Sequence, residues 1–414
     1  MTILTKDTIT DYLKIHMPFL DYSRPLIISA VGDGDIEEDG DGYINFVYRV
    51  SDGRYKLILK QAQTQGRMVG DYVLPLDRAE LEYDTMRLRA SIVPEYLPKL
   101  YFNDPEEHIF VEEDVSHLQI MRFQLIKNRI YPKFAEQAAE FLAKSHFYTS
   151  EYYLDTDTFR KLTIRFMNHR MRNIFDTGAF TFKRIPEESF GGEFDPRFMK
   201  YVRDMCMDPQ VAMVRHQLRH AYISKAETLI HGDYHTSNTF IDENEMKVID
   251  MEYTFAGPLS YDMGYMLGQL LAQYFTVDFR SYGSEEERKA FKDYMRDTMR
   301  EFYEGYCRVF FACWDEDAKD VYRDLPLLQE DVRQNLLREM AGFCANTNLG
   351  RCAGDIGFPE YDMLDDPLRR IHAVCISILC DVQVLKNYRN YTSYDDFWSD
   401  IEATEAAYKE HFDW

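Results

Sequence analysis

Between residues 233 and 252, three of the acidic side chains and one of the amides occur in an order suited to moving a phosphoryl group. Asp233 and Asn238 occupy a short polar loop between two apolar segments, and Asp250 and Glu252 end the next short strand. Phosphoryl transfer needs a carboxylate beside the acceptor hydroxyl and oxygen ligands for Mg²⁺ on the phosphates. We therefore predict Asp233 and Asn238 as catalytic residues. Asp250, Glu252 and Asn238 are the predicted magnesium ligands.

The polar loop has a second interpretation as an ordinary hairpin turn, since aspartate and asparagine are common in turns. The Asp-x-Glu that follows weakens this interpretation. An acid at the end of a buried strand, such as Asp250 after Ile249, needs a partner, and a metal ion is one. The pair of motifs therefore favours a metal and phosphate site over a turn.

Lys60 is the cation best placed along the chain to contact phosphates. It ends an apolar strand after a glycine-bearing hairpin, where a lysine can reach ATP if an acid on the next helix orients it. Glu82 is the predicted partner, and Glu80 is its competitor. Alone, Lys60 would be typical of a solvated strand end. Its order relative to Asp233 and Asp250 favours the ATP-binding role.

The elements that must position these side chains begin with a helix and an antiparallel meander. Apolar side chains alternate along 43–50, as on a half-buried strand, and a hairpin signal follows at 51–53. The predicted helices of this part span 4–19 and 78–89. Its predicted strands span 25–31, 43–50, 54–60, 97–102 and 108–113.

Beyond Ser116 helical periodicity dominates. A strong helix is predicted over 131–146 with Pro132 near its start, and one β-like insert at 228–253 carries the acidic motifs. We therefore predict an α+β fold with two lobes. A small β-rich N-lobe spans 1–117, and a large, mainly helical C-lobe spans 118–414.

The glycine loop, the lysine, the His-Gly-Asp with its asparagine and the Asp-x-Glu resemble the aminoglycoside phosphotransferase and choline kinase branch of the protein-kinase-like fold. Several segments look closer still to the 5-methylthioribose kinase family, in the right order across both lobes. Those segments are GYINFVY at 42–48, LILKQA at 57–62, DRAELE at 77–82, EDVSHL at 113–118, HGDYHT at 231–236, DMEYTFAGP at 250–258 and YDMG at 261–264.

The resemblance implies a role for each matching position. Residues from Gly42 to Asn45 would cover the phosphates of ATP, with Lys60 in contact with them. Glu82 would orient Lys60. Backbone groups near Glu113 and Val115 would hold adenine. The remaining implied roles are a sugar hydroxyl oriented by Asp233, Mg²⁺ on Asp250 and Glu252, and a sugar contact from Arg351.

Three departures from the family pattern bear on the substrate. An acidic insertion spans Asp35–Asp41 within the glycine loop and would repel phosphates unless it points outward. The family uses two adjacent arginines to bind its sugar; here Arg351 is retained, but Gly350 stands in place of the first. Asn238 replaces a residue that is often Ser in the family. The changes at Gly350 and Asn238 leave the ATP chemistry intact and concern the acceptor.

The resemblance implies an ATP-dependent kinase for the anomeric hydroxyl of 5-methylthioribose or a related 5-deoxypentose. A kinase for an amino alcohol or aminoglycoside is an alternative within enzymes, because an acidic helical lobe would suit a cationic acceptor. A catalytically silent nucleotide-binding pseudokinase is the alternative from another class. The presence of Lys60, Asp233, Asp250 and Glu252 together speaks against it.

The bulk composition limits partners and compartment. The formal net charge is −23, so nucleic acid and anionic membranes are not expected as partners. The seven cysteines form no Cys-x-x-Cys pair, a pattern typical of a reducing compartment. Neither a signal peptide nor a membrane-spanning run is recognised. We expect a cytoplasmic protein, and the resemblance implies a homodimer.

Overall fold

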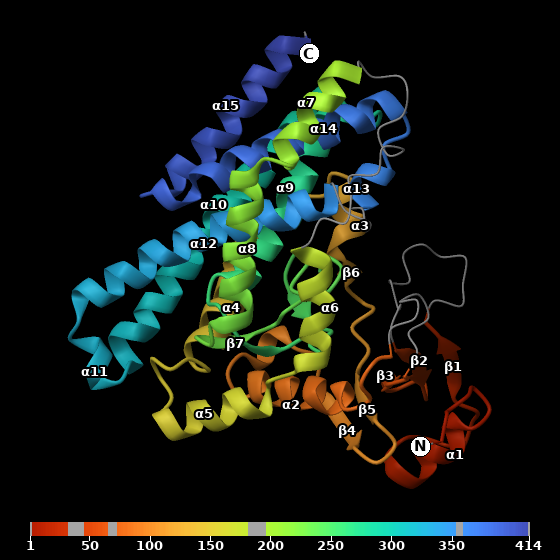
Figure 1. Cartoon of the computed structure of the whole chain (residues 1–414). Helices are drawn as coiled ribbons and strands as arrows, with labels where there is room; N and C mark the ends of the chain where they lie inside the picture. The colour runs from red at the N-terminus through yellow and green to blue at the C-terminus, as the bar shows by residue number, and fades with distance from the viewer. Residues whose placement is uncertain (1, 32–44, 65–72, 181–195, 353–358, 413–414) are drawn as a thin grey trace.

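The computed structural model describes residues 2–31, 45–64, 73–180, 196–352 and 359–412. A small antiparallel sheet with its helices forms one end of the molecule, and helices form the rest (Figure 1). The predicted two-lobed, protein-kinase-like α+β fold is confirmed. Gly42 and the acidic insertion Asp35–Asp41 lie outside the described residues. The lobe boundary at 117/118 stays a prediction.

The N-lobe holds one five-stranded antiparallel sheet in the order β1-β2-β3-β5-β4. Gly53 has φ +92° in the predicted β2–β3 turn, a conformation that favours glycine. The elements of this lobe are α1 (Ile9–His16), β1 (Ile27–Ala30), β2 (Phe46–Ser51), β3 (Lys56–Gln61), α2 (Arg78–Ala90), β4 (Leu100–Asp104) and β5 (Ile109–Glu113), with a short 3-10 turn at Pro94–Tyr96.

The first helix is shorter than the predicted span of 4–19. It ends at His16, and the next residue, Met17, leaves the helical region with φ −130° and ψ 63°. Met17 precedes Pro18, and a residue before proline is disfavoured in the α conformation. At the other end, Thr8 is the N-cap. Local backbone sterics therefore shorten the helix.

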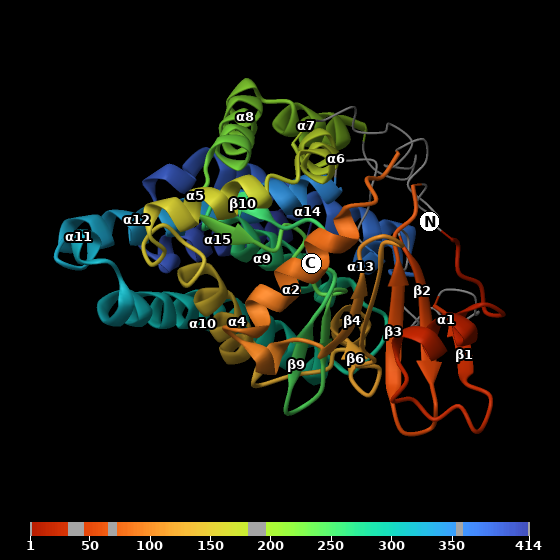
Figure 2. The ribbon, with the colours of Figure 1, turned by 90° about the horizontal axis from the view of Figure 1, so that it is seen from below.

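The two faces of the N-lobe sheet have different chemistry because side chains alternate along a strand. On one face, Leu59 and Val111 are buried in a cluster with Ile9 and Leu13 of α1. On the other face lie Lys60, Phe110 and Glu112. The face that carries Lys60 is thus the one turned toward the C-lobe, because Lys60 contacts Asp250 there. Figure 2 shows the sheet beside the helices of the C-lobe.

The C-lobe contains five short strands and a stack of helices. Its strands are β6 (Gln119–Ile120), β7 (Thr228–Ile230), β8 (Thr239–Ile241), β9 (Met246–Val248) and β10 (Phe255–Gly257). Its helices are α3 (Met121–Ile126), α4 (Phe134–Phe147), α5 (Thr156–Arg165), α6 (His169–Ala179), α7 (Pro196–Cys206), α8 (Pro209–Ser224), α9 (Tyr261–Thr276), α10 (Glu285–Asp317), α11 (Asp320–Arg323), α12 (Pro326–Cys352), α13 (Pro359–Asp362), α14 (Pro367–Asn387) and α15 (Tyr394–Phe412), with short 3-10 turns at Val277–Phe279 and Tyr388–Asn390.

Helix α9 runs through the centre of this lobe, and every one of its residues is buried. Two glycines on it allow α12 to approach closely. A Cβ on Gly264 would lie 2.6 Å from Phe343 Cβ, and one on Gly268 would lie 2.9 Å from the Cys344 carbonyl oxygen. Any larger residue would therefore push the two helices apart.

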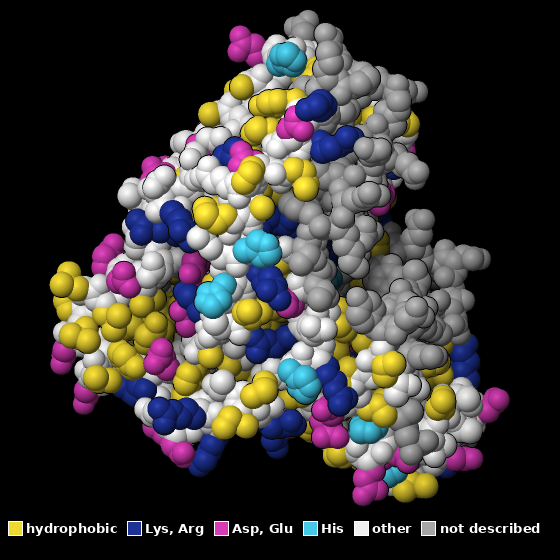
Figure 3. Space-filling model, in the orientation of Figure 1, with side chains coloured by type: hydrophobic (Ala, Val, Ile, Leu, Met, Phe, Trp, Pro, Cys, Tyr) yellow, Lys and Arg dark blue, Asp and Glu magenta, His cyan; other side chains and the backbone are white. Residues whose placement is uncertain are grey.

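Charged side chains of both signs are interspersed over the face shown in Figure 3. All seven cysteines are free thiols. Within the ranges that the structure describes, no helix is both long enough and apolar enough to cross a bilayer.

Candidate active site

The loop between β7 and β8 carries Asp233 and is fixed through its backbone. The N–H groups of His231 and Gly232 both donate to the carboxylate of Asp262 at the start of α9. His146 contacts the same carboxylate, with Nε2 3.1 Å from Oδ2. Gly232 has φ +85°, and a Cβ there would lie 2.4 Å from the Tyr253 carbonyl oxygen. Only glycine fits this turn.

The histidines around this anchor are neutral. Burial lowers the pKa of His231 to about 4, and burial also lowers the pKa of His146. For Asp262, burial raises the pKa, but the hydrogen bond from His146 and the positive charge nearby, Arg89 included, together outweigh it, and the net shift is downward. Asp262 is therefore an ionised acceptor for two backbone amides, a charge-assisted arrangement that stiffens the loop.

Asp233 lies in a small group of polar side chains of the C-lobe, named here the Asp233 cluster. Its members are Asp233, His235, Tyr265 and Arg351. His235 Nε2 lies 3.4 Å from Asp233 Oδ2, and the Ser237 N–H donates to His235 Nδ1. Arg351 Nη2 donates to the Tyr265 hydroxyl at 3.0 Å, and the Asp233 carboxylate lies near enough to that hydroxyl to add to the rise that burial causes in its pKa.

These neighbours keep Asp233 ionised. Burial alone would raise the pKa of Asp233, but His235 and the Arg351 guanidinium shift it below the ordinary aspartate value. The carboxylate can therefore accept a hydrogen bond from a hydroxyl at neutral pH. Asn238 supports the same loop, since its Nδ2 donates to the Asp233 carbonyl oxygen at 3.0 Å.

A second group of charges spans the two lobes, named here the lobe-spanning cluster. Its members are Lys60, Arg78, Glu82, Glu112, Asp250 and Glu252. Lys60 Nζ lies 2.8 Å from Glu82 Oε1, 3.3 Å from Glu112 Oε1 and 3.4 Å from Asp250 Oδ1. Burial lowers the pKa of Lys60, but these carboxylates outweigh it and hold the pKa well above the ordinary lysine value.

The other acid of the Asp-x-Glu motif has its own cation. Arg78 is fully buried, and its Nε lies 3.0 Å from Glu252 Oε2. Its remaining donors bind the carbonyl oxygens of Gln63 and Pro75 and the Asn45 side chain. Asn45 Nδ2 in turn donates to Glu252 Oε2 at 3.2 Å. Two N-lobe side chains therefore hold Glu252, a C-lobe residue.

The charges of the lobe-spanning cluster favour a bound cation. When ionised, its four carboxylates outnumber its two cations, so two negative charges are in excess. Burial, with Asp250 nearby, raises the pKa of Glu252 to about 7, and burial raises that of Glu82 to about 8 despite Lys60. A divalent cation would relieve this repulsion.

The donor atoms present also suit Mg²⁺. The Asp250 carboxylate is 37% exposed, and its backbone is left-handed at φ +67°. Among the described residues, no three His, Cys, Asp or Glu side chains converge into a ready-made metal cage. Mg²⁺ is usually held by one or two carboxylates together with phosphates and waters. Asp250 and Glu252 fit that pattern.

The segment after β5 connects the two lobes and is fixed by backbone hydrogen bonds. The Asp114 N–H donates to the Lys56 carbonyl oxygen and the Glu113 N–H to that of Lys99. Val115 is buried, and its carbonyl oxygen accepts from the Leu118 N–H. The two residues predicted near adenine, Glu113 and Val115, therefore lie on a well-ordered connector.

Comparison with known proteins identifies the family. The model of a phosphotransferase enzyme family matches residues 35–306. Methylthioribose kinase from Geobacillus kaustophilus is 30% identical over 363 residues, which cover 87% of this chain and 89% of the relative. The chain belongs to the methylthioribose kinase branch of this phosphotransferase family.

Other relatives have the same name. Methylthioribose kinase from Geobacillus thermodenitrificans is 31% identical to this phosphotransferase over 81% of the chain and 83% of the relative. The crystal structure of a choline/ethanolamine kinase family protein from Mesorhizobium loti has 14% identity and a TM-score of 0.42, and covers 97% of this chain and 100% of that one.

The structure brings most of the predicted site residues of this phosphotransferase into two groups. Lys60 pairs with Glu82, whereas Glu80 lies 3.6 Å from His108. Asp233 and Arg351 fall in the other group. The Asn45 side chain contacts Arg78 and Glu252, so only its backbone remains for the predicted phosphate contact.

Sequence reasoning missed four residues of these groups: Arg78, Glu112, His235 and Tyr265. Glu112 could have been found, because it alternates with Phe110 on the strand face that carries Lys60. Arg78 is the first residue of a helix whose sequence pattern is typical of an exposed helix. Tyr265 lies in an apolar helix in which every residue is buried, so its sequence pattern indicates only core.

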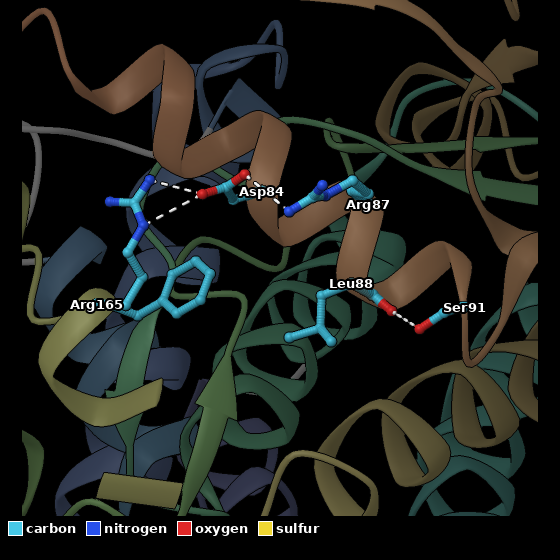
Figure 4. Close-up of a pocket in the computed structure, with 6 residues that line it drawn as sticks. Asp84, Arg87, Leu88, Ser91 and Arg165 are labelled. Carbon is cyan, nitrogen blue, oxygen red and sulfur yellow. Dashed lines mark hydrogen bonds and ion pairs between the residues drawn. The ribbon is translucent and has the colours of Figure 1, made fainter. Parts of the chain in front are cut away.

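One surface pocket lies away from both clusters. It has a volume of about 500 Å³ and is lined by Asp84, Arg87, Leu88, Ser91, Arg165 and Phe166, between α2 and α5 (Figure 4). The Asp84 carboxylate there accepts from Arg165 Nε and Nη2. This pocket shares no side chain with the two clusters, so we assign the chemistry to the clusters and not to the pocket.

Proposed function

We propose that this phosphotransferase moves the γ-phosphoryl group of ATP to the anomeric hydroxyl of 5-methylthioribose or a related 5-deoxypentose. The observation that carries the proposal is the similarity to methylthioribose kinases over most of the chain. ATP use is expected from the family. The two charge clusters supply the side chains that such a reaction needs.

In this proposal Asp233 accepts the proton of the sugar hydroxyl. Its lowered pKa keeps it ionised, and the anchored backbone of His231 and Gly232 holds it in place. Lys60 contacts the phosphates and is kept charged and oriented by Glu82. The chain's contribution is thus positioning and electrostatic stabilisation rather than covalent chemistry.

Mg²⁺ is the proposed metal, with Asp250, Glu252 and Asn238 as its protein ligands. When bound, it would offset the charge of the phosphates. Arg78 and Asn45 hold one oxygen of Glu252 on the side of the N-lobe. Asn238 Nδ2 is used within its own loop, so its amide oxygen is the atom proposed for the metal.

Nucleotide binding is proposed at the connector and the glycine loop. The Glu113 and Asp114 amides are already used in backbone hydrogen bonds. The Glu113 carbonyl oxygen and the Val115 amide are therefore the groups proposed to bind adenine. Gly42 and the Asn45 backbone are proposed to cover the phosphates.

The first experiment is an acceptor screen that follows ADP release with Mg²⁺-ATP. It includes 5-methylthioribose, ribose, other 5-substituted riboses, choline and an aminoglycoside. We expect turnover with 5-methylthioribose and with at least one other 5-substituted pentose, because Gly350 leaves more room than a second arginine would. Turnover only with choline or the aminoglycoside would show that the acceptor is a cationic molecule and not a sugar.

The metal assignment has a separate test in Asp250→Ala. Removing a carboxylate ligand leaves the phosphate charge less well neutralised, so Mg²⁺ should strengthen ATP binding less than in the wild type. ATP titrations by calorimetry with and without Mg²⁺ measure this without turnover. An unchanged Mg²⁺ dependence would contradict the assignment of Asp250.

We also infer a cytoplasmic location, because the seven free thiols suit a reducing compartment. The homodimer is proposed from the family resemblance alone. Light scattering of the purified chain would determine its oligomeric state.

A further inference from the structure

Tyr265 lies between the proposed catalytic carboxylate and the arginine that the sequence assigns to the sugar. Its hydroxyl accepts from Arg351 Nη2 at 3.0 Å, and burial together with the nearby Asp233 carboxylate raises the pKa of the phenol to about 12. Its side chain projects from α9, and the residue is only 2% exposed. Arg351 comes from α12 and Asp233 from the loop after β7, so one phenol joins three separate segments.

The direction of these hydrogen bonds is fixed by chemistry. A guanidinium has only donors, so the Tyr265 oxygen must accept from Arg351. An ionised carboxylate has only acceptors, so in a contact with Asp233 the Tyr265 O–H is the donor. Each group has one role open to it, and a chain of bonds from Arg351 through Tyr265 to Asp233 would satisfy all three.

The packing of the helices explains why this chain of bonds is possible. Gly264 and Gly268 bring α12 into backbone contact with α9, and Tyr265 lies between these two glycines. Arg351 is near the end of α12, on the helix that these contacts hold. The same packing gives Tyr265 a rigid position, since its ring stacks on Tyr261 at 5.8 Å.

We propose that Tyr265 is a positioning residue that transmits Arg351 to Asp233 and orients the carboxylate toward the acceptor hydroxyl. This inference rests on the proposed function. It changes the expected role of Arg351, which acts on the base through Tyr265. Losing either residue then lowers kcat, while the KM values for sugar and for ATP stay close to those of the wild type.

Tyr261 provides a matched control. It lies one helical turn before Tyr265 on the same helix and is equally buried, and its hydroxyl has no hydrogen-bond partner among the described residues. Tyr261→Phe therefore removes the same atom without removing a bond. We expect its kcat to stay within about twofold of the wild type, as for a hydroxyl with no contact to lose.

The experiment is a double-mutant cycle of Tyr265→Phe and Arg351→Met, measured with the best accepted sugar of the acceptor screen. Each single variant should lose about 10- to 100-fold in kcat, the range expected for a hydrogen bond to a charged group. The double variant should be no slower than Tyr265→Phe alone. Losses that multiply in the double variant, or a rise in sugar KM as the main effect, would overturn the proposal.

A conservative replacement gives a second, sharper comparison. Arg351→Lys retains a donor for the Tyr265 hydroxyl, so it should recover part of the activity lost in Arg351→Met. The same lysine should recover nothing in the Tyr265→Phe background, and equal recovery in both backgrounds would overturn the proposal. If Tyr265→Phe does not fold, judged by its thermal transition, the Arg351→Lys and Arg351→Met pair decides by whether kcat or sugar KM changes.

Failure of the proposed function would be visible separately. It appears in the wild type, as an absence of turnover with every sugar in the screen. Failure of the Tyr265 inference appears only among variants of an active enzyme.

Discussion

The two C-lobe carboxylates of the lobe-spanning cluster receive their cations from the other lobe, whereas Asp233 receives its partners from its own lobe. Asp250 and Glu252 belong to the C-lobe, and Lys60 and Arg78 reach them from the N-lobe. His235, Tyr265 and Arg351 all belong to the C-lobe. The first cluster therefore requires a particular arrangement of the lobes, and the second does not.

The two clusters therefore depend on different parts of the fold. Buried charges that pair across the lobes couple nucleotide and metal binding to the position of the N-lobe, because an unpaired buried charge is costly. The Asp233 cluster instead depends on the packing of α9 against α12. Changes in one cluster should consequently leave the ligand of the other almost untouched.

The largest expected effect comes from Asp233→Asn. Loss of the proposed base should lower kcat by about 100- to 10,000-fold. ATP affinity should stay within about twofold of the wild type, since the substitution lies in the cluster that does not hold the nucleotide. ADP-release kinetics and calorimetric ATP titration measure the two quantities. Turnover near that of the wild type would show that Asp233 is not the base.

The next largest effect is expected from Arg78→Met, a substitution that breaks the lobe-spanning cluster. Glu252 then keeps a buried charge without its arginine, which should cost about 3–5 kcal/mol in the free energy of unfolding. Mg²⁺-ATP should recover part of the loss by binding the same carboxylate. Urea unfolding with and without Mg²⁺-ATP measures both.

Arg87→Met is the matched control for this prediction. Arg87 lies on the same helix, with 71% of its side chain exposed, so its loss should cost less than about 1 kcal/mol. Equal stability losses in the two variants would mean that the Arg78–Glu252 pair does not couple the lobes.

The same contrast explains what the sequence predicts. Lys60, Glu82 and the Asp-x-Glu motif occur in a fixed order, and the structure brings Lys60 within 3.4 Å of both Glu82 and Asp250. The two-lobed fold also follows from local patterns, namely strand alternation before residue 117 and helical periodicity after it. Helix ends depend on single residues, as Pro18 shows for α1.

The site residues that could not be predicted from the sequence share a physical reason. Arg78 and Tyr265 act through contacts with segments far away along the chain, and no local period reveals such contacts. Arg78 pairs with a residue 174 positions later, and Tyr265 with one 86 positions later. The Asp233 cluster was therefore harder to predict than the lobe-spanning cluster, for which the metal chemistry itself demands a second acid.

A smaller effect concerns the pH dependence of the Asp233 cluster. The reaction needs ionised Asp233, and its lowered pKa extends activity below the ordinary aspartate range. Part of that lowering comes from Arg351. In Arg351→Ala the acidic limb of the kcat profile should move to higher pH. Kinetics at saturating sugar and ATP, from pH 8 down to the lowest pH at which the enzyme stays folded, measure this shift. Normalised profiles that coincide would show that Arg351 does not influence Asp233.

The smallest effect is expected at the exposed contact between the lobes, the Asp84–Arg165 pair of Figure 4. Like Arg78–Glu252, it joins α2 to the C-lobe, but 46% of the Arg165 side chain and 29% of Asp84 are exposed. Water and salt screen such a pair, so Arg165→Ala should cost less than about 1 kcal/mol. Its kcat should stay within about twofold of the wild type, as judged by urea unfolding and ADP release. A loss as large as that of Arg78→Met would show that contact between the lobes, and not burial of the charge, determines the coupling.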